Sequence, residues 1–129
     1  MPKILLVEDD PSIARMLIRI LTLGGHYEAV HAAEGKTGLE LALSISPDLI
    51  LLDIMMPEMN GMEVLDALKA NATVSHIPVL MMTNLGSEQN AHLALEKGAV
   101  DYVVKSDVDP QEVLATIQKY LQPLPTPSN

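Results

Sequence analysis

Residues 49–53 read LILLD, in which four consecutive apolar residues end at the carboxylate of Asp53. An apolar run of this length without polar alternation is typical of a strand that is buried on both faces. Two further short runs are Lys3–Val7 (KILLV) and Val79–Met82 (VLMM). Strands that are covered on both faces belong to parallel sheets, so the sequence predicts a parallel sheet at the centre of the fold.

Helix-length segments with cap residues separate the apolar runs. Asp10 and Asp109 each stand before a proline, as an N-cap residue does before a proline at the first helical position. Residues 60–63 (NGME) have the spacing of a capping box, Ser87 is a further expected cap, and Gly98 marks a helix end. The expected strands, each followed by a helix, are Lys3–Val7, Tyr27–Ala32, Leu49–Leu52, Val79–Met82 and Tyr102–Val104.

Five successive strand–helix units predict an α/β fold, namely one flavodoxin-like, doubly wound (βα)5 domain with the parallel strand order 2-1-3-4-5. We expect this domain over residues 1–121, with the proline-rich residues 122–129 as a tail or the start of a linker. A helical bundle fits less well, because the apolar runs have strand length and are isolated by caps and glycines. The first helix carries an apolar stripe at helical spacing, formed by Ile13, Met16, Leu17, Ile20 and Leu21.

The composition is that of a globular domain with an excess of acidic residues. The chain has 129 residues, 17 of them acidic and 8 basic, which gives a formal charge of −9. This charge repels phosphate backbones, and three tyrosines without Phe or Trp offer few stacking platforms, so we expect no nucleic-acid binding. The absence of cysteine excludes disulfides and thiolate chemistry. The first apolar run is too short for a signal peptide or a membrane span, which favours a cytoplasmic domain.

Polar residues follow four of the five expected strands at their carboxyl ends. They are Glu8, Asp9 and Asp10 after the first strand, Asp53 after the third, Thr83 after the fourth and Lys105 after the fifth. Ligands of open parallel sheets bind at this edge, near the point where the strand order reverses. In the order 2-1-3-4-5, the carboxylates, the hydroxyl and the ammonium therefore converge on one cleft.

The converging groups suit a divalent cation and a phosphoryl group. Three carboxylates at one rim repel one another unless a cation neutralises them, and their hard oxygens suit Mg²⁺. Asp53 can form an aspartyl-phosphate, Thr83 can donate a hydrogen bond to a phosphoryl oxygen, and Lys105 can neutralise another oxygen. The formal charges of three carboxylates, Mg²⁺ and Lys105 sum to about zero before phosphorylation and to about −1 afterwards.

Four motifs together resemble the receiver domain of two-component response regulators. They are ILLVEDD at Ile4–Asp10, LILLDIMMPEMNG at Leu49–Gly61, PVLMMTN at Pro78–Asn84 and GAVDYVVK at Gly98–Lys105. Their order and spacing agree with that family from Lys3 to about Leu121, which is nearly the whole chain. The resemblance implies a phosphorylation-activated switch that is not a classical enzyme, since it catalyses only its own phosphorylation and dephosphorylation.

The resemblance also implies how the phosphoryl group is handled. Asp53 would accept it from the phosphohistidine of a sensor histidine kinase or phosphotransfer protein, and Thr83 and Lys105 would bind it. Tyr102 would be the switch aromatic that turns inward when Thr83 is drawn to the phosphoryl group, although it also fits a strand tyrosine that half covers the sheet. The output would be a changed surface on the fourth helix, fifth strand and fifth helix, offered to an output partner, an output domain or a second copy in a homodimer.

The metal ligands are likewise implied by the resemblance. Asp9 and Asp53 would bind Mg²⁺ directly, Glu8 would bind it through water, and Met55 would bind it through its backbone carbonyl. Asp10, the third acidic residue of the loop, is expected mainly to cap the first helix. The sequence therefore predicts that Mg²⁺ is the cofactor.

The sequence departs from the family pattern at two loop positions. Ser106 follows Lys105 where the family has a proline in a cis bond, and Asn84 follows the threonine where a small residue is commoner. A cis bond before a non-proline residue costs about 2.5–4 kcal/mol, so we expect a trans Lys105–Ser106 bond. The four histidines, none of which follows a strand or has metal-ligand spacing, are expected at the surface or in packing; they are His26, His31, His76 and His92.

Other functions fit the sequence less well. A haloacid-dehalogenase-like phosphatase needs a second aspartate two residues after the nucleophile, but Met55 stands there. A flavodoxin-like cofactor site needs a phosphate-binding loop after the first strand, but that loop is acidic. A P-loop kinase is excluded because the GxxxxGK motif is absent. A receiver-like module that binds partners without phosphorylation remains open, although the complete acceptor set argues against it.

Overall fold

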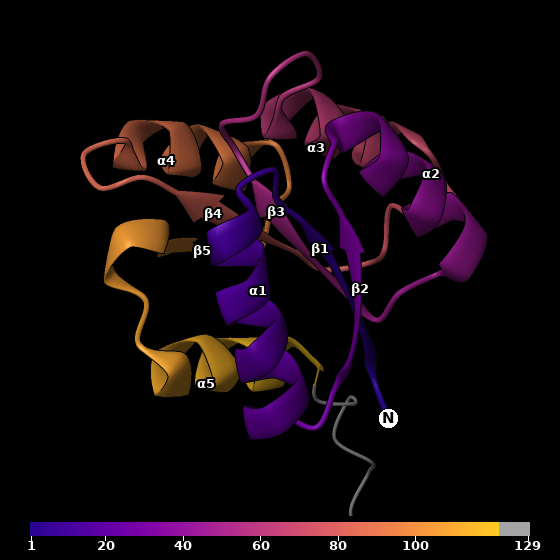
Figure 1. Cartoon of the computed structure of the whole chain (residues 1–129). Coiled ribbons are helices and arrows are strands. Elements are labelled where there is room, and N and C mark those ends of the chain that lie inside the picture. The colour runs from indigo at the N-terminus through magenta and orange to yellow at the C-terminus, as the bar shows by residue number, and fades with distance from the viewer. Residues whose placement is uncertain (122–129) are drawn as a thin grey trace, which may run out of the picture.

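A five-stranded parallel sheet forms the centre of the computed structural model, which describes residues 1–121 (Figure 1). Its strand order is β2-β1-β3-β4-β5, which confirms the predicted flavodoxin-like, doubly wound fold. The strands are β1 (Lys3–Val7), β2 (Glu28–Ala32), β3 (Leu49–Asp53), β4 (Val79–Thr83) and β5 (Asp101–Val104). The α-helices are α1 (Pro11–Arg19), α2 (Gly35–Ile45), α3 (Gly61–Ala70), α4 (Glu88–Glu96) and α5 (Pro110–Leu121). The expected tail, 122–129, lies outside the described residues.

Helices cover both faces of the sheet and divide the core into two clusters (Figure 1). Alternating strand residues supply the two clusters: Leu5 and Ile50 pack with α2, α3 and α4, whereas Ile4 and Leu51 pack with α1 and α5. Burial of each such side chain contributes about 1.5–3 kcal/mol. β3 and β4 are buried at every residue, while the edge strands β2 and β5 are partly exposed. Within residues 1–121, no helix combines the length and apolarity needed to cross a bilayer.

Three of the four predicted helix caps form as expected. The Asp10 carboxylate accepts hydrogen bonds from two first-turn N–H groups of α1 at 2.8 and 3.2 Å. Asn60 and Glu63 form a complete capping box at the start of α3, and Asp109 accepts a first-turn N–H of α5 at 2.9 Å. Ser87 precedes α4, but within the described chain its side chain makes no capping hydrogen bond. The start of α4 is therefore held less firmly than the starts of α1 and α3.

The end of the first helix is distorted. α1 ends at Arg19 and continues as a π-helical turn over Ile20–Gly24. Inside this turn the Thr22 hydroxyl donates to the Ile18 carbonyl at 2.8 Å, a side-chain bond of the type that bends helices. The sequence predicts a single helix up to the glycines, because its apolar periodicity continues through this turn.

Four strand boundaries and one side chain differ from the prediction: β3 and β4 each extend one residue further than predicted, to Asp53 and Thr83. β2 begins at Glu28, one residue later than predicted, and β5 begins at Asp101, one residue earlier. Met16 is 37% exposed, although it belongs to the predicted apolar stripe of the first helix. Ala14 and Leu17 are the buried residues of α1. Compared with the predicted stripe, the buried face of the helix therefore includes Ala14 in place of Met16. Met16 lies on the helix surface away from the face that Ala14 and Leu17 bury.

Gly61, the first residue of α3, packs directly against the end of β3. Its N–H donates to the Ile54 carbonyl at 2.9 Å. A Cβ at Gly61 would collide with the backbone carbonyl of Asp53 and stand 2.8 Å from Ile54 Cα. Because both obstacles are backbone, they can yield only if the end of β3 moves. We expect Gly61→Ala to lower the free energy of unfolding by roughly 3 kcal/mol.

Urea unfolding followed by far-UV circular dichroism measures this effect. Gly24→Ala is the matched control, because a Cβ at Gly24 would meet only Leu114 Cδ1, at 2.8 Å, which is the end of a flexible side chain. The control should change stability only slightly. Similar losses in the two variants would contradict the assigned contact between Gly61 and β3.

Candidate functional site

The carboxyl ends of four strands bring the predicted polar side chains to one edge of the sheet. Glu8 directly follows β1, Asp53 ends β3, Thr83 ends β4 and Lys105 directly follows β5. The strands are parallel and paired up to these ends, so the four residues lie along one edge. Glu8, Asp53 and Thr83 are at most 1% exposed. The structure therefore brings the four strand ends to one edge, where Lys105 contacts Glu8 and Asp53.

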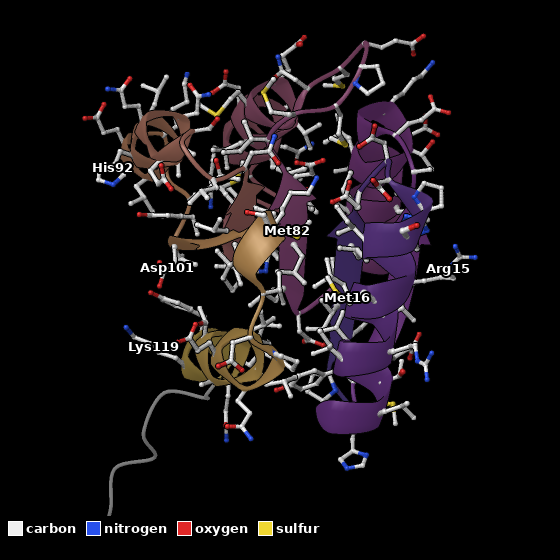
Figure 2. All side chains as sticks on the ribbon, turned by 60° about the vertical axis from the view of Figure 1, so that its left-hand side comes forward. Arg15, Met16, Met82, His92, Asp101 and Lys119 are labelled. Carbon is white, nitrogen blue, oxygen red and sulfur yellow. The ribbon has the colours of Figure 1, made fainter. Side chains whose placement is uncertain are left out.

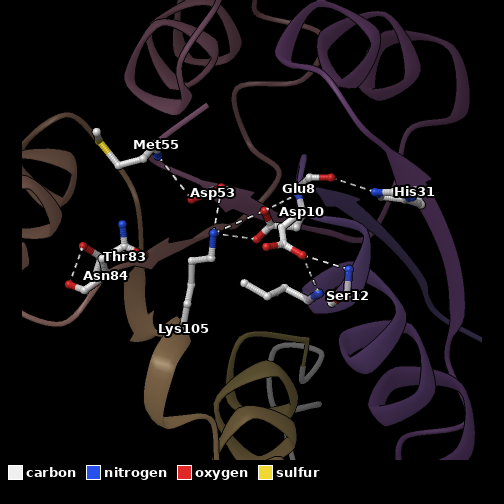
Figure 3. A network of polar contacts seen from close by, with 10 residues as sticks. Glu8, Asp10, Ser12, His31, Asp53, Met55, Thr83, Asn84 and Lys105 are labelled. Atoms are coloured by element: carbon white, nitrogen blue, oxygen red, sulfur yellow. Dashed lines mark hydrogen bonds and ion pairs between the residues drawn. The ribbon is translucent and has the colours of Figure 1, made fainter. Parts of the chain in front are cut away.

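The ammonium group of Lys105 lies between two buried carboxylates (Figure 3). Lys105 Nζ is 2.9 Å from Asp53 Oδ2 and 2.9 Å from Glu8 Oε1, and it donates to Glu8 Oε2 at 3.2 Å. Residues 1–121 contain no cis peptide bond, so the Lys105–Ser106 bond is trans, as predicted. A 3₁₀ turn over Lys105–Asp107 accommodates this loop while the ammonium stays between the carboxylates.

Backbone N–H groups complete the hydrogen bonding of the two carboxylates. The Asp10 N–H donates to Glu8 Oε2 at 3.0 Å, and the Met55 N–H donates to Asp53 Oδ1 at 3.2 Å. Glu8 Oε1 is buried, and no donor among the described residues reaches it with hydrogen-bond geometry, although Lys105 Nζ is at ion-pair distance. This oxygen therefore has an ion-pair partner but no hydrogen bond of good geometry.

Burial and mutual charge set the protonation of the cluster. Burial raises the pKa of Glu8 to about 7, against the opposing effect of the bonds from Asp10 N–H and Lys105. Burial also raises the pKa of Asp53, again opposed by Lys105. Burial alone would lower the pKa of Lys105, but its bonds to Glu8 and Asp53 outweigh burial and raise it. The ammonium therefore stays charged, and one positive charge faces two carboxylates.

The arrangement fits a hard divalent cation. Carboxylate oxygens of Glu8, Asp9 and Asp53 lie within 4.8 Å of one another, and Asp9 is exposed on the solvent side of this group. Mg²⁺ favours such oxygen ligands together with water. The buried Glu8 Oε1 without a donor and the excess of negative charge are the two observations that a cation would resolve.

The two predicted switch residues lie on the α4 side of the site. The Thr83 hydroxyl donates to the Ser87 carbonyl at 3.1 Å and approaches the Asn84 carbonyl at 3.4 Å, so it is directed toward the loop before α4. Tyr102 is half-buried on β5, and its ring centroid is 5.7 Å from that of His92 on α4. Both residues therefore contact the segment that includes α4.

Sequence reasoning missed one residue of the site. The histidines are expected at the surface or in packing, but His31 is the penultimate residue of β2, and its Nε2 lies 2.8 Å from the Glu8 carbonyl oxygen (Figure 3). His31 is exposed, as expected of a surface histidine, and what sequence reasoning missed is this contact with the Glu8 carbonyl. The signal was present, because a strand ending at Ala32 next to β1 places residue 31 beside the acidic loop.

Comparisons with known proteins agree with this site. A family model described as the response regulator receiver domain matches residues 4–118. The DNA-binding dual master transcriptional regulator RpaA of Synechocystis is 38% identical over 122 residues, covering 95% of this chain and 50% of the relative. A probable cyclic di-GMP phosphodiesterase of Vibrio cholerae is 40% identical over 102 residues, covering 79% of this chain and 23% of the relative. The chain thus spans half or less of these relatives.

One solved structure matches this chain over nearly the whole length of both proteins. The chemotaxis protein CheY4 of Vibrio cholerae is 32% identical, with a TM-score of 0.84, and the match covers 93% of this chain and 98% of that chain. Fold and family model together define a signalling module of the two-component type. The chain belongs to the receiver domains of two-component response regulators.

The raised pKa of Glu8 predicts how stability depends on pH without metal. Between about pH 4.5 and 7 the folded state keeps a proton that the unfolded state has released, so stability falls as pH rises. Glu8→Gln removes this contribution. We compare the free energy of unfolding of Glu8→Gln with that of wild type, both in a chelator. This difference should favour the variant by on the order of 1–3 kcal/mol more at pH 7.5 than at pH 5.

Denaturant unfolding at the two pH values measures the difference. Glu40→Gln, at an exposed position on α2, is the matched control and should leave the pH dependence unchanged. If Glu8→Gln and wild type show the same change in stability between pH 5 and 7.5, the raised pKa of Glu8 is refuted.

Proposed function

We propose that this domain is a signalling switch that accepts a phosphoryl group on Asp53. The observation that carries the proposal is the placement of Asp53, buried at the end of β3, with Lys105 Nζ at 2.9 Å and further acidic oxygens within 4.8 Å. An attacking carboxylate needs a nearby cation to offset the charge of the incoming phosphoryl group. Lys105 is placed to supply part of that charge.

The donor in this proposal is a phosphohistidine on a sensor histidine kinase or a phosphotransfer protein. An Asp53 carboxylate oxygen forms the new P–O bond while the P–N bond of the donor breaks, and the electron pair stays on the imidazole nitrogen. Lys105 neutralises phosphoryl oxygens, and Thr83 donates a hydrogen bond to one of them. The Met55 N–H, 3.2 Å from Asp53 Oδ1, holds the carboxylate in a fixed orientation.

We infer that Mg²⁺ is the cofactor. Asp9 and Asp53 would hold it directly, Glu8 would hold it through water, and the backbone carbonyl of Met55 would complete the protein ligands. When bound, Mg²⁺ offsets the charge of the carboxylates and of the phosphoryl oxygens. The carboxylate oxygens of Glu8, Asp9 and Asp53 within 4.8 Å of one another support this assignment.

The output in this proposal is a changed surface on α4, β5 and α5. Thr83 now donates to the Ser87 carbonyl, just before α4, so a hydrogen bond to a phosphoryl oxygen would release that contact. Tyr102 is half-buried next to His92 of α4 and would turn inward as Thr83 moves. A partner, an output domain or a second copy of the chain would read this surface. The relatives' names cover both DNA binding and phosphodiesterase activity, so the kind of output is left open.

The acceptor assignment is tested with acetyl phosphate as a small phosphoryl donor. We expect one phosphoryl group per chain with Mg²⁺, none in Asp53→Asn and none in a chelator, as measured by intact mass. Asp9→Asn should weaken Mg²⁺ binding more than Asp10→Asn, because Asp10 caps α1 through hydrogen bonds at 2.8 and 3.2 Å. Undiminished phosphorylation of Asp53→Asn would exclude Asp53 as the acceptor. Equal phosphorylation of wild type with and without chelator would contradict the need for Mg²⁺.

The lifetime of the phosphorylated state is expected to be long. Hydrolysis needs a water in line with the phosphorus, opposite the Asp53 oxygen, and the residues two positions past Asp53 and Thr83 are Met55 and Leu85. They are 56% and 73% exposed, and neither can orient a water by a hydrogen bond. We expect Met55→Asn combined with Leu85→Glu to speed dephosphorylation by up to about 100-fold, because polar groups can position the water.

Loss of the phosphoryl group is followed on Phos-tag gels after the donor is removed. The matched control combines Met55→Leu with Leu85→Met, which keeps both positions apolar and should keep the wild-type lifetime. Equal lifetimes for wild type and the polar double variant would show that these two positions do not control access of water.

A further inference from the structure

His31 holds the backbone of Glu8 from the neighbouring strand. Its Nε2 is 2.8 Å from the Glu8 carbonyl oxygen, and the Glu8 N–H donates to the Ala32 carbonyl at 3.0 Å (Figure 3). The last paired residue of β1 is Val7, opposite Ala32. The N–H and the C=O of Glu8 are therefore both bonded to β2, although Glu8 lies one residue past the paired part of β1. The bond to the C=O comes from the side chain of His31.

The contact fixes the proton on the His31 ring. A carbonyl oxygen can only accept a hydrogen bond, so the ring nitrogen that meets it must be the donor. The 2.8 Å separation between Nε2 and the oxygen is a normal hydrogen-bond length. His31 therefore carries a proton on Nε2 in the domain without metal.

The Glu8 carbonyl belongs to the peptide group that leads into Asp9. The Glu8 side chain is already held by Lys105 at 2.9 Å and by the Asp10 N–H at 3.0 Å. Asp9 is exposed, and its position follows from the orientation of the peptide plane before it. A bond that holds this carbonyl therefore restricts the backbone from which the Asp9 carboxylate reaches toward Glu8 and Asp53.

We propose that His31 is a positioning residue for the cation site. By donating Nε2–H to the Glu8 carbonyl, it orients the Glu8–Asp9 peptide so that the Asp9 oxygen meets those of Glu8 and Asp53. It contacts neither the cation nor the phosphoryl group and acts only through the backbone. The inference rests on the proposed function of this acidic group as a Mg²⁺ site. Groups that orient metal ligands in this way commonly tune metal affinity.

Isothermal titration of the metal-free domain with MgCl2 tests the inference. His31→Phe keeps a ring but removes the donor, and we expect it to weaken Mg²⁺ binding roughly threefold to tenfold, the value of one hydrogen bond. His31→Gln places an amide N–H where Nε2 was and should restore most of the affinity. His76→Phe, an exposed histidine in the turn after α3, is the matched control and should bind Mg²⁺ like wild type.

A second readout does not require metal. The ring ¹⁵N shifts of His31 in the metal-free domain should show Nε2 protonated, and the backbone amide of Asp9 should shift in His31→Phe but return toward wild type in His31→Gln. Wild-type Mg²⁺ affinity in a folded His31→Phe, loss of affinity that His31→Gln does not restore, or an unprotonated Nε2 would each overturn the proposal. A wild-type domain that binds no Mg²⁺ and takes no label from acetyl phosphate would instead reject the proposed function.

Discussion

The ion pair that Lys105 shares with Glu8 and Asp53 is the interaction on which the site depends. Two carboxylates that are at most 1% exposed carry a large desolvation cost, and a cation at 2.9 Å from each is what makes their burial tolerable. Above about pH 7, where Glu8 is ionised, one ammonium cannot balance two carboxylates, so the cluster then carries an excess of negative charge. A fold that buries this cluster is therefore suited to take up a further cation and, with it, a phosphoryl group.

The sheet explains how one lysine reaches both carboxylates. In the order β2-β1-β3-β4-β5, the strand that carries Lys105 lies two strands away from β3 and three away from β1. Only a long side chain spans that distance, and its apolar stem can cross the buried end of β4 while its ammonium stays beside the oxygens. A shorter cationic group, or a different strand order, would leave Glu8 buried without a counter-charge. The strand order therefore requires a side chain as long as that of lysine at this position. Figure 3 shows Lys105 between Glu8 and Asp53, and Figure 2 shows the side chains around the sheet from another side.

Most of the fold and the main site residues could be predicted from the sequence because their signals are local. The LILLD run, the caps at Asp10 and Asn60 and the polar residues after each strand are all visible in short segments, and parallel order brings the strand ends together. The bond between His31 and the Glu8 carbonyl could not be recognised in this way, because it depends on a ring orientation across two strands. The exposure of Met16 likewise depends on which face α1 turns to the sheet, which apolar spacing alone does not fix.

The starts of α1 and α4 are anchored differently, which supports the proposal that a change at Asp53 acts on α4 and not on α1. α1 begins with the Asp10 cap, and the side chain of Glu8 is bonded to the N–H of that same residue, so the start of α1 is tied to the acidic cluster itself. α4 begins without a side-chain cap bond among the described residues and buries only Ala91 and Ala94. Elements with little buried apolar area open or shift at the lowest free-energy cost. In the proposed function, a movement of Thr83, which bonds the carbonyl just before α4, would therefore act on a helix whose start has no side-chain cap bond.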